Sequence, residues 1–243
     1  MKQNKYDDTV FFEKYSKMDR STKGLAGAGE WETLEKLLPQ FKDKRVLDLG
    51  CGFGWHCQYA MEHGAKSVTG VDLSENMLQI AKEKTDERIN YLRMPIEDIS
   101  FNNNSFDAVV SSLAFHYIEN FQPVAEKIAS YLVPGGDFVF SAEHPVFTSY
   151  GSQDWYYDEE GNILHFPVDR YFYEGRRTTD FLGEKVIKYH RTLTTYLNIL
   201  LQAGFEITGF AEPQPPEHLL KTVKGMSDDL RRPMMLIIKA RKK

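Results

Sequence analysis

The chain has 243 residues, of which 42% are hydrophobic and 27% charged, a composition typical of a folded globular protein rather than a disordered one. Thirty Lys and Arg residues against 35 Asp and Glu residues give a net charge of -5, whereas a dedicated duplex-DNA binder normally carries a basic surplus. We therefore expect one domain spanning residues 1–243 and no nucleic-acid partner.

The cysteines and the apolar runs indicate the compartment. Cys51 and Cys57 make no disulfide framework, and no Cys/His set has zinc-finger spacing, so we expect no metal site. The N-terminus has no apolar signal core, and no apolar run approaches the roughly 18 residues that span a bilayer. These features predict a soluble, cytoplasmic protein with no membrane insertion.

Short apolar runs alternate with helical patterns along most of the chain. The runs predict strands at residues 45–49, 67–71, 89–93, 106–111, 137–142, 205–211 and 234–240. Helical spacing predicts helices at residues 55–63, 74–84, 121–132 and 192–203. Strands separated by helices of this length form βαβ units. We therefore predict an α/β fold with a doubly wound, mostly parallel sheet and an antiparallel pair of strands at one edge.

Two regions interrupt this alternation. Residues 1–40 precede the first strand and have helical spacing, with Trp31, Leu34 and Leu37 on one face. Residues 144–190 form a long insertion, rich in aromatic residues, between the fifth strand and the next helix. A structureless loop of this length is unusual in a compact domain, so we predict a small antiparallel β flap.

The strongest chemical motif follows the first predicted strand. Asp48-Leu-Gly50-Cys-Gly52-Phe-Gly54 stands between a strand and a helix, where glycines let the chain turn tightly and let a ligand approach the backbone. Asp72 ends the second strand, 22 residues after Gly50, where nucleotide-binding doubly wound folds carry a ribose-binding carboxylate. The alternative interpretation is that these residues bind no ligand: the glycines only form a tight turn, and Asp72 only caps the following helix.

These motifs resemble those of the class I S-adenosylmethionine-dependent methyltransferases, and most closely the branch that includes the ubiquinone and menaquinone methyltransferases. The resemblance covers residues 40–142 and, more weakly, residues 192–212. It rests on the stretches V-L-D-L-G-C-G-F-G-W-H, V-T-G-V-D-L-S-E-N-M-L, I-E-D-I-S-F-N-N-N-S-F-D-A-V-V-S-S and L-V-P-G-G. It implies a Rossmann-like seven-stranded sheet with an antiparallel last strand, and S-adenosylmethionine bound above the carboxyl ends of the first strands.

The resemblance also implies which residues bind the cofactor. It assigns the methionine moiety to Asp48, Gly50, Cys51, Gly52 and Ser112, the ribose to Asp72, the adenosine to Leu73 and Met77, and the adenine to Ile96 and Glu97. Pro95 stands where the family often has an acidic residue for the adenine amine, so Glu97 or the backbone N–H of Ile96 is expected to replace it. Residues 1–40 are expected to fold over the cofactor as a lid, with Tyr15 or Arg20 at the methionine carboxylate.

Two other functions remain open. An NAD(P)-dependent oxidoreductase usually carries G-x-G-x-x-G, whereas this turn reads G-x-G-x-G, and Asp48 suits an ammonium group better than a pyrophosphate. A non-catalytic S-adenosylmethionine-binding protein, whose flap binds a partner, is the alternative outside the enzymes.

The predicted acceptor is a small molecule methylated at O, N or C. After the fourth strand the chain reads S-S-L-A-F-H, not the Asn/Asp-Pro-Pro-Tyr of enzymes that methylate amino groups of DNA or protein glutamine. His116, His144 and His190 are the candidate general bases, because an imidazole titrates at about pH 6.5. The alternative for each is a hydrogen-bonded structural histidine.

The flap offers further candidates for contact with the acceptor. Its aromatic residues could roof the acceptor, shield a sulfonium by cation–π contact, or form the flap's own core. They are Trp155, Tyr156, Tyr157, Tyr171, Phe172 and Tyr173. Its charged residues Asp169, Arg170, Arg176 and Arg177 either grip a polar acceptor or form a solvated face.

Overall fold

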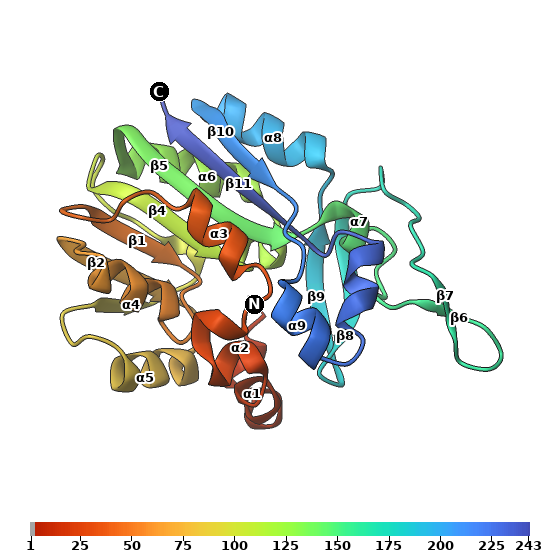
Figure 1. Cartoon of the computed structure of the whole chain (residues 1–243). Helices are drawn as coiled ribbons and strands as arrows, with labels where there is room; N and C mark the ends of the chain where they lie inside the picture. Colours follow the sequence, from red (N-terminus) through yellow and green to blue (C-terminus); the bar gives the residue numbers. More distant parts are fainter. Residues whose placement is uncertain (1–2) are drawn as a thin grey trace.

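The computed structural model describes residues 3–243, and its centre is a seven-stranded sheet in the order β10-β11-β5-β4-β1-β2-β3 (Figure 1). The strands are β1 (Arg45–Leu49), β2 (Ser67–Asp72), β3 (Asn90–Arg93), β4 (Phe106–Ser112), β5 (Leu132–Glu143), β10 (Phe205–Ala211) and β11 (Met235–Lys242). The strands from β1 to β5 pair in parallel, and β11 runs antiparallel to both β5 and β10. The predicted α/β fold with an antiparallel last strand is confirmed.

Alternation of side chains along the strands produces two apolar faces. In β5, Phe138 and Phe140 point to the face covered by α6 (Phe121–Tyr131) and α8 (Leu193–Gln202). Val139 points to the opposite face, which is covered by α3 (Trp31–Leu37). The helices α4 (Trp55–Glu62) and α5 (Glu75–Lys84) pack against other strands on the β1 side of the sheet. Within residues 3–243 none of the helices is long and apolar enough to cross a bilayer.

The insertion between β5 and α8 contains α7 (Pro145–Thr148) and two hairpins. The short pair β6 (Tyr156–Tyr157) and β7 (Ile163–His165) projects from the body of the molecule (Figure 1). The longer pair β8 (Gly175–Phe181) and β9 (Glu184–His190) reaches the carboxyl end of β5 through a hydrogen bond from Lys188 to Glu143. The predicted antiparallel flap is therefore confirmed as two separate hairpins.

The segment before β1 is helical, as predicted, but is broken into short pieces. They are η1 (Lys5–Asp7), α1 (Thr9–Ser16), α2 (Asp19–Thr22), η2 (Gly24–Gly27) and α3. Asp8 begins α1 by accepting a hydrogen bond from the backbone N–H of Phe11 at 2.9 Å, the usual cap for unpaired N–H groups of a first turn. The prediction for residues 1 and 2 lies outside the described residues.

Two details differ from the sequence prediction. β5 begins at Leu132 rather than at residue 137, because residues 132–136 continue beside β4 across a register shift between Phe106 and Ala108. The proline-rich connection between β10 and β11 contains α9 (Glu217–Thr222) and η5 (Met226–Arg231), which were not predicted. Pro216 precedes α9 as its N-cap, a position where the missing N–H costs no helical hydrogen bond.

Replacing Phe140 by Ala should lower the free energy of unfolding by about 3–5 kcal/mol, because its ring is fully buried against other aromatic rings of the core. Denaturant unfolding followed by circular dichroism measures the change. Phe172→Ala is the matched control, because that ring is 86% exposed and its loss should change stability by no more than about 0.5 kcal/mol. Equal losses for the two variants would contradict this account of the core.

Candidate active site

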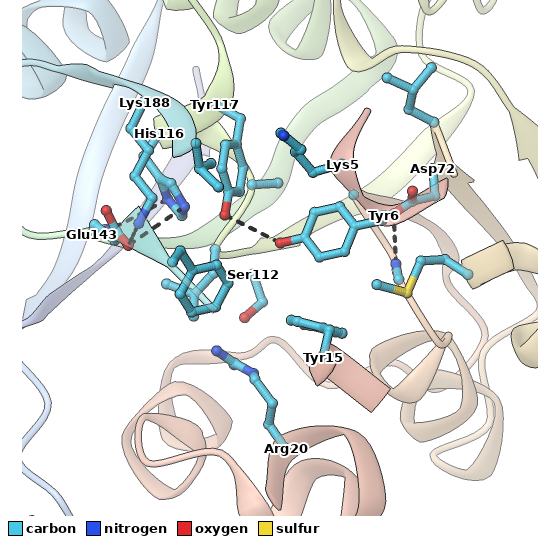
Figure 2. Close-up of a pocket in the computed structure, with 18 of the residues that line it drawn as sticks. Lys5, Tyr6, Tyr15, Arg20, Asp72, Ser112, His116, Tyr117, Glu143 and Lys188 are labelled. Atoms are coloured by element: carbon cyan, nitrogen blue, oxygen red, sulfur yellow. Dashed lines mark hydrogen bonds and ion pairs between the residues drawn. The ribbon is translucent and has the colours of Figure 1, made fainter. Parts of the chain in front are cut away.

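A cavity of about 780 Å³ lies where β1, β2, β4 and β5 end at one edge of the sheet. Residues of the N-terminal segment and of the β8–β9 hairpin form much of the rest of its wall (Figure 2). The predicted site residues on this wall are Tyr15, Arg20, Gly50, Cys51, Gly52, Asp72, Leu73, Met77, Ile96, Glu97, Ser112 and His116. Asp48, His144 and His190 do not line it. Among residues 3–243 no cluster of side chains could hold a metal ion.

The glycine turn after β1 forms the floor of one end of the cavity. The backbone N–H groups of Gly50 and Cys51 donate to the carbonyl of Val71, which ties the turn to β2. A Cβ on Gly50 would lie 2.5 Å from Cβ of Ala114, so only glycine lets the turn pass this close to the loop after β4. At Gly52 no atom lies within 4 Å of where a Cβ would stand, so the missing side chain leaves open space.

Asp72 stands at the end of β2 with both carboxylate oxygens facing backbone donors. Oδ2 accepts from the N–H of Gly52 at 2.9 Å, and Oδ1 accepts from the N–H of Ser74 at 2.8 Å. Burial raises the pKa of Asp72, and these hydrogen bonds oppose the rise. Each oxygen has further accepting capacity, because a carboxylate offers about four lone-pair sites. The carboxylate can therefore accept two more hydrogen bonds from a ligand in the cavity.

Asp48 lies behind the glycine turn rather than on the cavity wall. Its carboxyl group is buried; Oδ2 accepts from the thiol of Cys57 at 3.3 Å, and Oδ1 has no hydrogen-bond partner. Burial is the main cause that raises the pKa of Asp48 to about 7. The resemblance implied a direct contact between Asp48 and the methionine moiety, but Asp48 is not among the residues that line the cavity.

The first described residues form a strap across the cavity, and we call residues 3–7 the N-terminal strap. The carboxylate of Asp7 accepts from Ser74 Oγ at 2.5 Å and from the N–H groups of Asn76 and Glu75 at 3.1 and 3.3 Å. At the other end of the strap, Gln3 Oε1 accepts from the N–H of Ile187 in β9 at 2.8 Å. The strap therefore joins the start of α5 to the inserted hairpin.

An ion pair with the buried Glu30 fixes Arg20, which with Tyr15 was predicted as a candidate for the methionine carboxylate. Its Nη2 donates to Oε1 of Glu30 at 2.6 Å, and Ser112 Oγ donates to the same oxygen at 3.3 Å. Burial raises the pKa of Glu30, but the Arg20 charge lowers it below its ordinary value overall. No motif in the sequence indicated Glu30, because acidic residues are common at the N-terminal ends of helices, where they interact favourably with the helix dipole.

Four polar side chains gather at the end of the cavity opposite Asp72, and we call His116, Glu143, Gln153 and Lys188 the polar cluster. The ammonium of Lys188 donates to Oε1 of Glu143 and, at 2.7 Å, to Oε1 of Gln153. Gln153 Nε2 donates to Oε2 of Glu143 at 2.6 Å. The N–H of Glu143 donates to Nδ1 of His116 at 3.4 Å, and Nε2 lies 4.0 Å from Oε1 of Glu143 (Figure 2).

Burial decides the charge of the imidazole in the polar cluster. It lowers the pKa of His116 to about 4, so this ring is neutral at pH 7. Burial alone raises the pKa of Glu143, but the neighbouring imidazole, the Lys188 ammonium and the hydrogen bonds lower it overall. The polar cluster thus holds one carboxylate, one ammonium and a neutral imidazole.

Tyr6 and Tyr117 stand between the two ends of the cavity. Their hydroxyl oxygens are 3.2 Å apart, with Tyr6 supplied by the N-terminal strap and Tyr117 by the turn η4 (Phe115–Tyr117) (Figure 2). The ring of Tyr6 also packs edge-on against that of Tyr15. Burial raises the pKa of both Tyr6 and Tyr117, so both keep their hydroxyl protons at neutral pH. Neither tyrosine can then serve as a base, although each can hydrogen-bond a ligand.

The other two candidate bases make structural contacts away from the cavity. His144 precedes α7, where its Nδ1 accepts from the N–H of Val146 at 3.1 Å and its Nε2 lies 2.9 Å from Oε1 of Glu212. His190 Nδ1 is 2.7 Å from Thr148 Oγ1, and its Nε2 is 2.8 Å from the carbonyl oxygen of Tyr171. Both imidazoles therefore make the contacts expected of a hydrogen-bonded structural histidine, which was the alternative to a general base.

The flap residues singled out in the sequence also lie off the cavity wall. None of the six predicted aromatic residues and none of the four predicted charged residues lines it. Trp155 instead packs against Phe166 and Arg232, and Arg177 donates to the carbonyls of Ser149 and Tyr173. The inserted segment reaches the cavity through other residues, chiefly Phe147, Gln153, Phe181 and Val186–Tyr189.

Comparison with known proteins identifies the family. A family model for the methyltransferase domain matches residues 47–140. The crystal structure of a Listeria monocytogenes protein assigned as an S-adenosylmethionine-dependent methyltransferase is 56% identical, covering 90% of this chain and 99% of that one with a TM-score of 0.86. An S-adenosylmethionine-dependent methyltransferase from Mesorhizobium loti is 42% identical, covering 90% of this chain and all of that one with a TM-score of 0.83. A ubiquinone biosynthesis O-methyltransferase from Coxiella burnetii is 33% identical over 45% of this chain and 47% of its own length.

The chain therefore belongs to the S-adenosylmethionine-dependent methyltransferases. S-adenosylmethionine is the cofactor of this family, as the resemblance implied.

Asp7→Ala should release the N-terminal strap, because three hydrogen bonds at the start of α5 lose their acceptor. We expect a loss on the order of 1 kcal/mol in strap docking, seen as several-fold faster amide hydrogen exchange over residues 3–16. Hydrogen bonds hold the pKa of Asp7 below its ordinary value despite partial burial. The stabilisation of the docked strap by Asp7 is therefore present above the ordinary pKa of a carboxyl group. It is lost as the pH falls through the lowered pKa that Asp7 has in the folded protein.

The control for this measurement is Glu13→Ala, which removes an exposed carboxylate of α1. Unchanged exchange in Asp7→Ala, or equally fast exchange in Glu13→Ala, would contradict the role given to Asp7.

Proposed function

We propose that this protein transfers the methyl group of S-adenosylmethionine to O, N or C of a small-molecule acceptor. The observation that carries the proposal is one cavity with two chemically different ends. The glycine turn and Asp72 form one end, and the polar cluster forms the other. A cofactor held at the first end can present its methyl group to an acceptor held at the second.

The first end fits the cofactor in two respects. Asp72 retains accepting capacity for two ribose hydroxyls, and Gly52 leaves space that no side chain fills. We assign the ribose to Asp72, the adenosine to Leu73 and Met77, the adenine to Ile96 and Glu97, and the methionine end to Gly50, Cys51, Gly52 and Ser112. Asp48 does not line the cavity, so we propose an indirect role for it through its hydrogen bond with Cys57 in α4, the helix that follows the turn.

We assign the methionine carboxylate to Arg20, with Tyr15 beside it. A guanidinium has five N–H donors, and the ion pair with Glu30 uses one of them. Tyr15 and Arg20 both line the cavity from the N-terminal segment. We propose that residues 3–40 form a lid over the cofactor, within a single domain, and that the N-terminal strap is its closing edge.

The bound cofactor supplies an electrophilic methyl group on a sulfonium, which leaves the protein mainly the tasks of alignment and exclusion of water. The strap and the β8–β9 hairpin cover the cavity and so exclude water from it. Of the three candidate histidines, His116 alone lines the cavity, and we propose that it contacts the acceptor. Because this ring is a weak base, we propose that it orients the acceptor by hydrogen bonding rather than by removing a proton.

A small-molecule acceptor agrees with the enclosure of the second end of the cavity by the strap and the inserted hairpin. The Coxiella burnetii relative is named for ubiquinone biosynthesis, an activity on a small molecule. Free Cys51 and Cys57 suit the reducing cytoplasm, where we propose that the protein works.

Asp72→Ala should weaken the binding of S-adenosylhomocysteine by about 1–3 kcal/mol, because two ribose hydroxyls lose their acceptor. Calorimetric titration measures the affinity, and Glu83→Ala, which removes an exposed carboxylate of α5, is the control. Unchanged affinity in Asp72→Ala would refute the ribose assignment.

Turnover separates an enzyme from a non-catalytic binding protein. Methyl-tritiated S-adenosylmethionine, incubated with the protein and a panel of small molecules, should label at least one acceptor. Tight binding of S-adenosylhomocysteine with no labelled product would favour the binding protein.

A further inference from the structure

We infer that the acceptor end of the cavity selects an uncharged molecule with a largely apolar body and one hydroxyl group directed at the polar cluster. The inference rests on the proposed function, because it concerns the acceptor of that reaction. Three features carry it: the apolar walls, a buried charge pair whose charges cancel, and a hydrogen-bond donor beside an acceptor.

The walls next to the polar cluster are mostly apolar side chains from separate segments. They are Phe147, Phe181, Val186, Ile187, Met234 and Met235. Such a surface favours a ligand with an apolar body, because moving apolar area out of water is favourable in proportion to that area. A strongly hydrated ligand would gain little from these walls.

The charges at this end of the cavity cancel in pairs. Lys188 is 4% exposed and bonds directly to the carboxylate of Glu143, whose side chain is 12% exposed. Gln153 bonds to both partners and so fixes the pair. A charged ligand placed here would lose its hydration without meeting an unpaired opposite charge, and burying an uncompensated ion is strongly unfavourable.

The other described lysine and arginine side chains that line the cavity are also paired with carboxylates, and Asp72, which is held by backbone N–H groups, lies at the other end of the cavity. Arg20 is balanced by Glu30 on the side of the cofactor. At the rim, Lys5 pairs with Glu184 and Asp180 with Lys185, and these pairs are open to solvent and screened by salt. They offer an incoming molecule no buried counter-charge.

His116 and Glu143 offer a donor and an acceptor side by side. Because Nδ1 of His116 accepts the N–H of Glu143, the neutral ring carries its proton on Nε2. The 4.0 Å between Nε2 and Oε1 of Glu143 is too long for a direct hydrogen bond, yet one atom can lie within bonding distance of both. A hydroxyl oxygen accepts and donates at once, whereas a carboxylate only accepts and an ammonium only donates.

The test uses the full chain saturated with S-adenosylhomocysteine and four matched probes, with affinities measured by ligand-detected NMR. They are para-ethylphenol, which is neutral; tyramine, which is cationic; para-hydroxyphenylacetate, which is anionic; and para-ethylanisole, which lacks the hydroxyl proton. We expect para-ethylphenol to bind at least about tenfold more tightly than each of the others.

Two variants should reverse this preference by leaving one charge unopposed. Glu143→Gln leaves the Lys188 ammonium unpaired and should make para-hydroxyphenylacetate the tightest probe. Lys188→Met leaves the carboxylate unpaired and should make tyramine the tightest. Lys185→Met is the matched control, because that lysine lies in the same strand with its ion pair in solvent, and it should keep the wild-type order.

The outcomes separate the two proposals. Failure of the wild-type protein to bind S-adenosylhomocysteine would refute the proposed function. Normal binding of S-adenosylhomocysteine with a charged probe preferred, or with no probe bound, would overturn this inference alone. Folded variants that keep the wild-type order would also overturn it, and if neither variant folds, the order of the four probes on the wild-type protein decides.

Discussion

The tight reversal of the chain after β1 is the constraint on which the site depends. At Gly50 the backbone has φ of 73°, and no side chain fits between this turn and Ala114. The reversal lets the turn donate to Val71, so the ends of β1, β2 and β4 lie close enough to share one cavity. Asp72 then faces the turn itself and is held by a backbone N–H of Gly52. A bulkier residue at Gly50 would separate these strand ends and remove the floor of the cavity.

The cavity wall at the polar cluster, opposite the glycine turn, depends on contacts between segments that are remote in the chain. The N-terminal strap, the end of β5 and the β8–β9 hairpin meet there, and none of them forms the wall alone. Polar side chains around the cavity satisfy one another: Lys188 bonds with Glu143, Arg20 with Glu30, and Tyr6 with Tyr117. Such mutual satisfaction is needed because an unpaired charge or hydroxyl in this setting would cost more than the surrounding apolar contacts provide.

The sequence was sufficient for the sheet and for the glycine turn because their signals are local. A strand, three glycines and Asp72 lie within one βαβ unit, so spacing alone brings them together. Of the polar cluster only His116 was predicted, because Gln153 and Lys188 belong to an insertion whose return to the sheet leaves no motif. Near the end of β5 the cavity wall includes Glu143, one position before the predicted His144. Strand alternation directs Glu143 into the cavity and its neighbour His144 towards Glu212.

His190, at the end of β9, illustrates the same limit. It shares a face of β9 with Val186 and Lys188, which line the cavity, but it lies beyond the cavity's end and packs on Thr148. The cavity takes residues from both faces of β9, Val186 to Tyr189, so periodicity does not identify them, and the point along β9 at which the cavity stops depends on the packing of α7. That packing is tertiary, and only the folded chain determines it.

The N-terminal strap touches both ends of the cavity, and this has a kinetic consequence. At one end Gln3 hydrogen-bonds Ile187 of β9, and at the other Asp7 holds the first turn of α5, the helix that follows Asp72. If the strap opens as the proposed lid, a displacement that admits an acceptor also uncovers the cofactor. Exchange of the spent cofactor and entry of the next acceptor would then be one event, and the opening rate of the strap, residues 3–7, would set a ceiling on turnover.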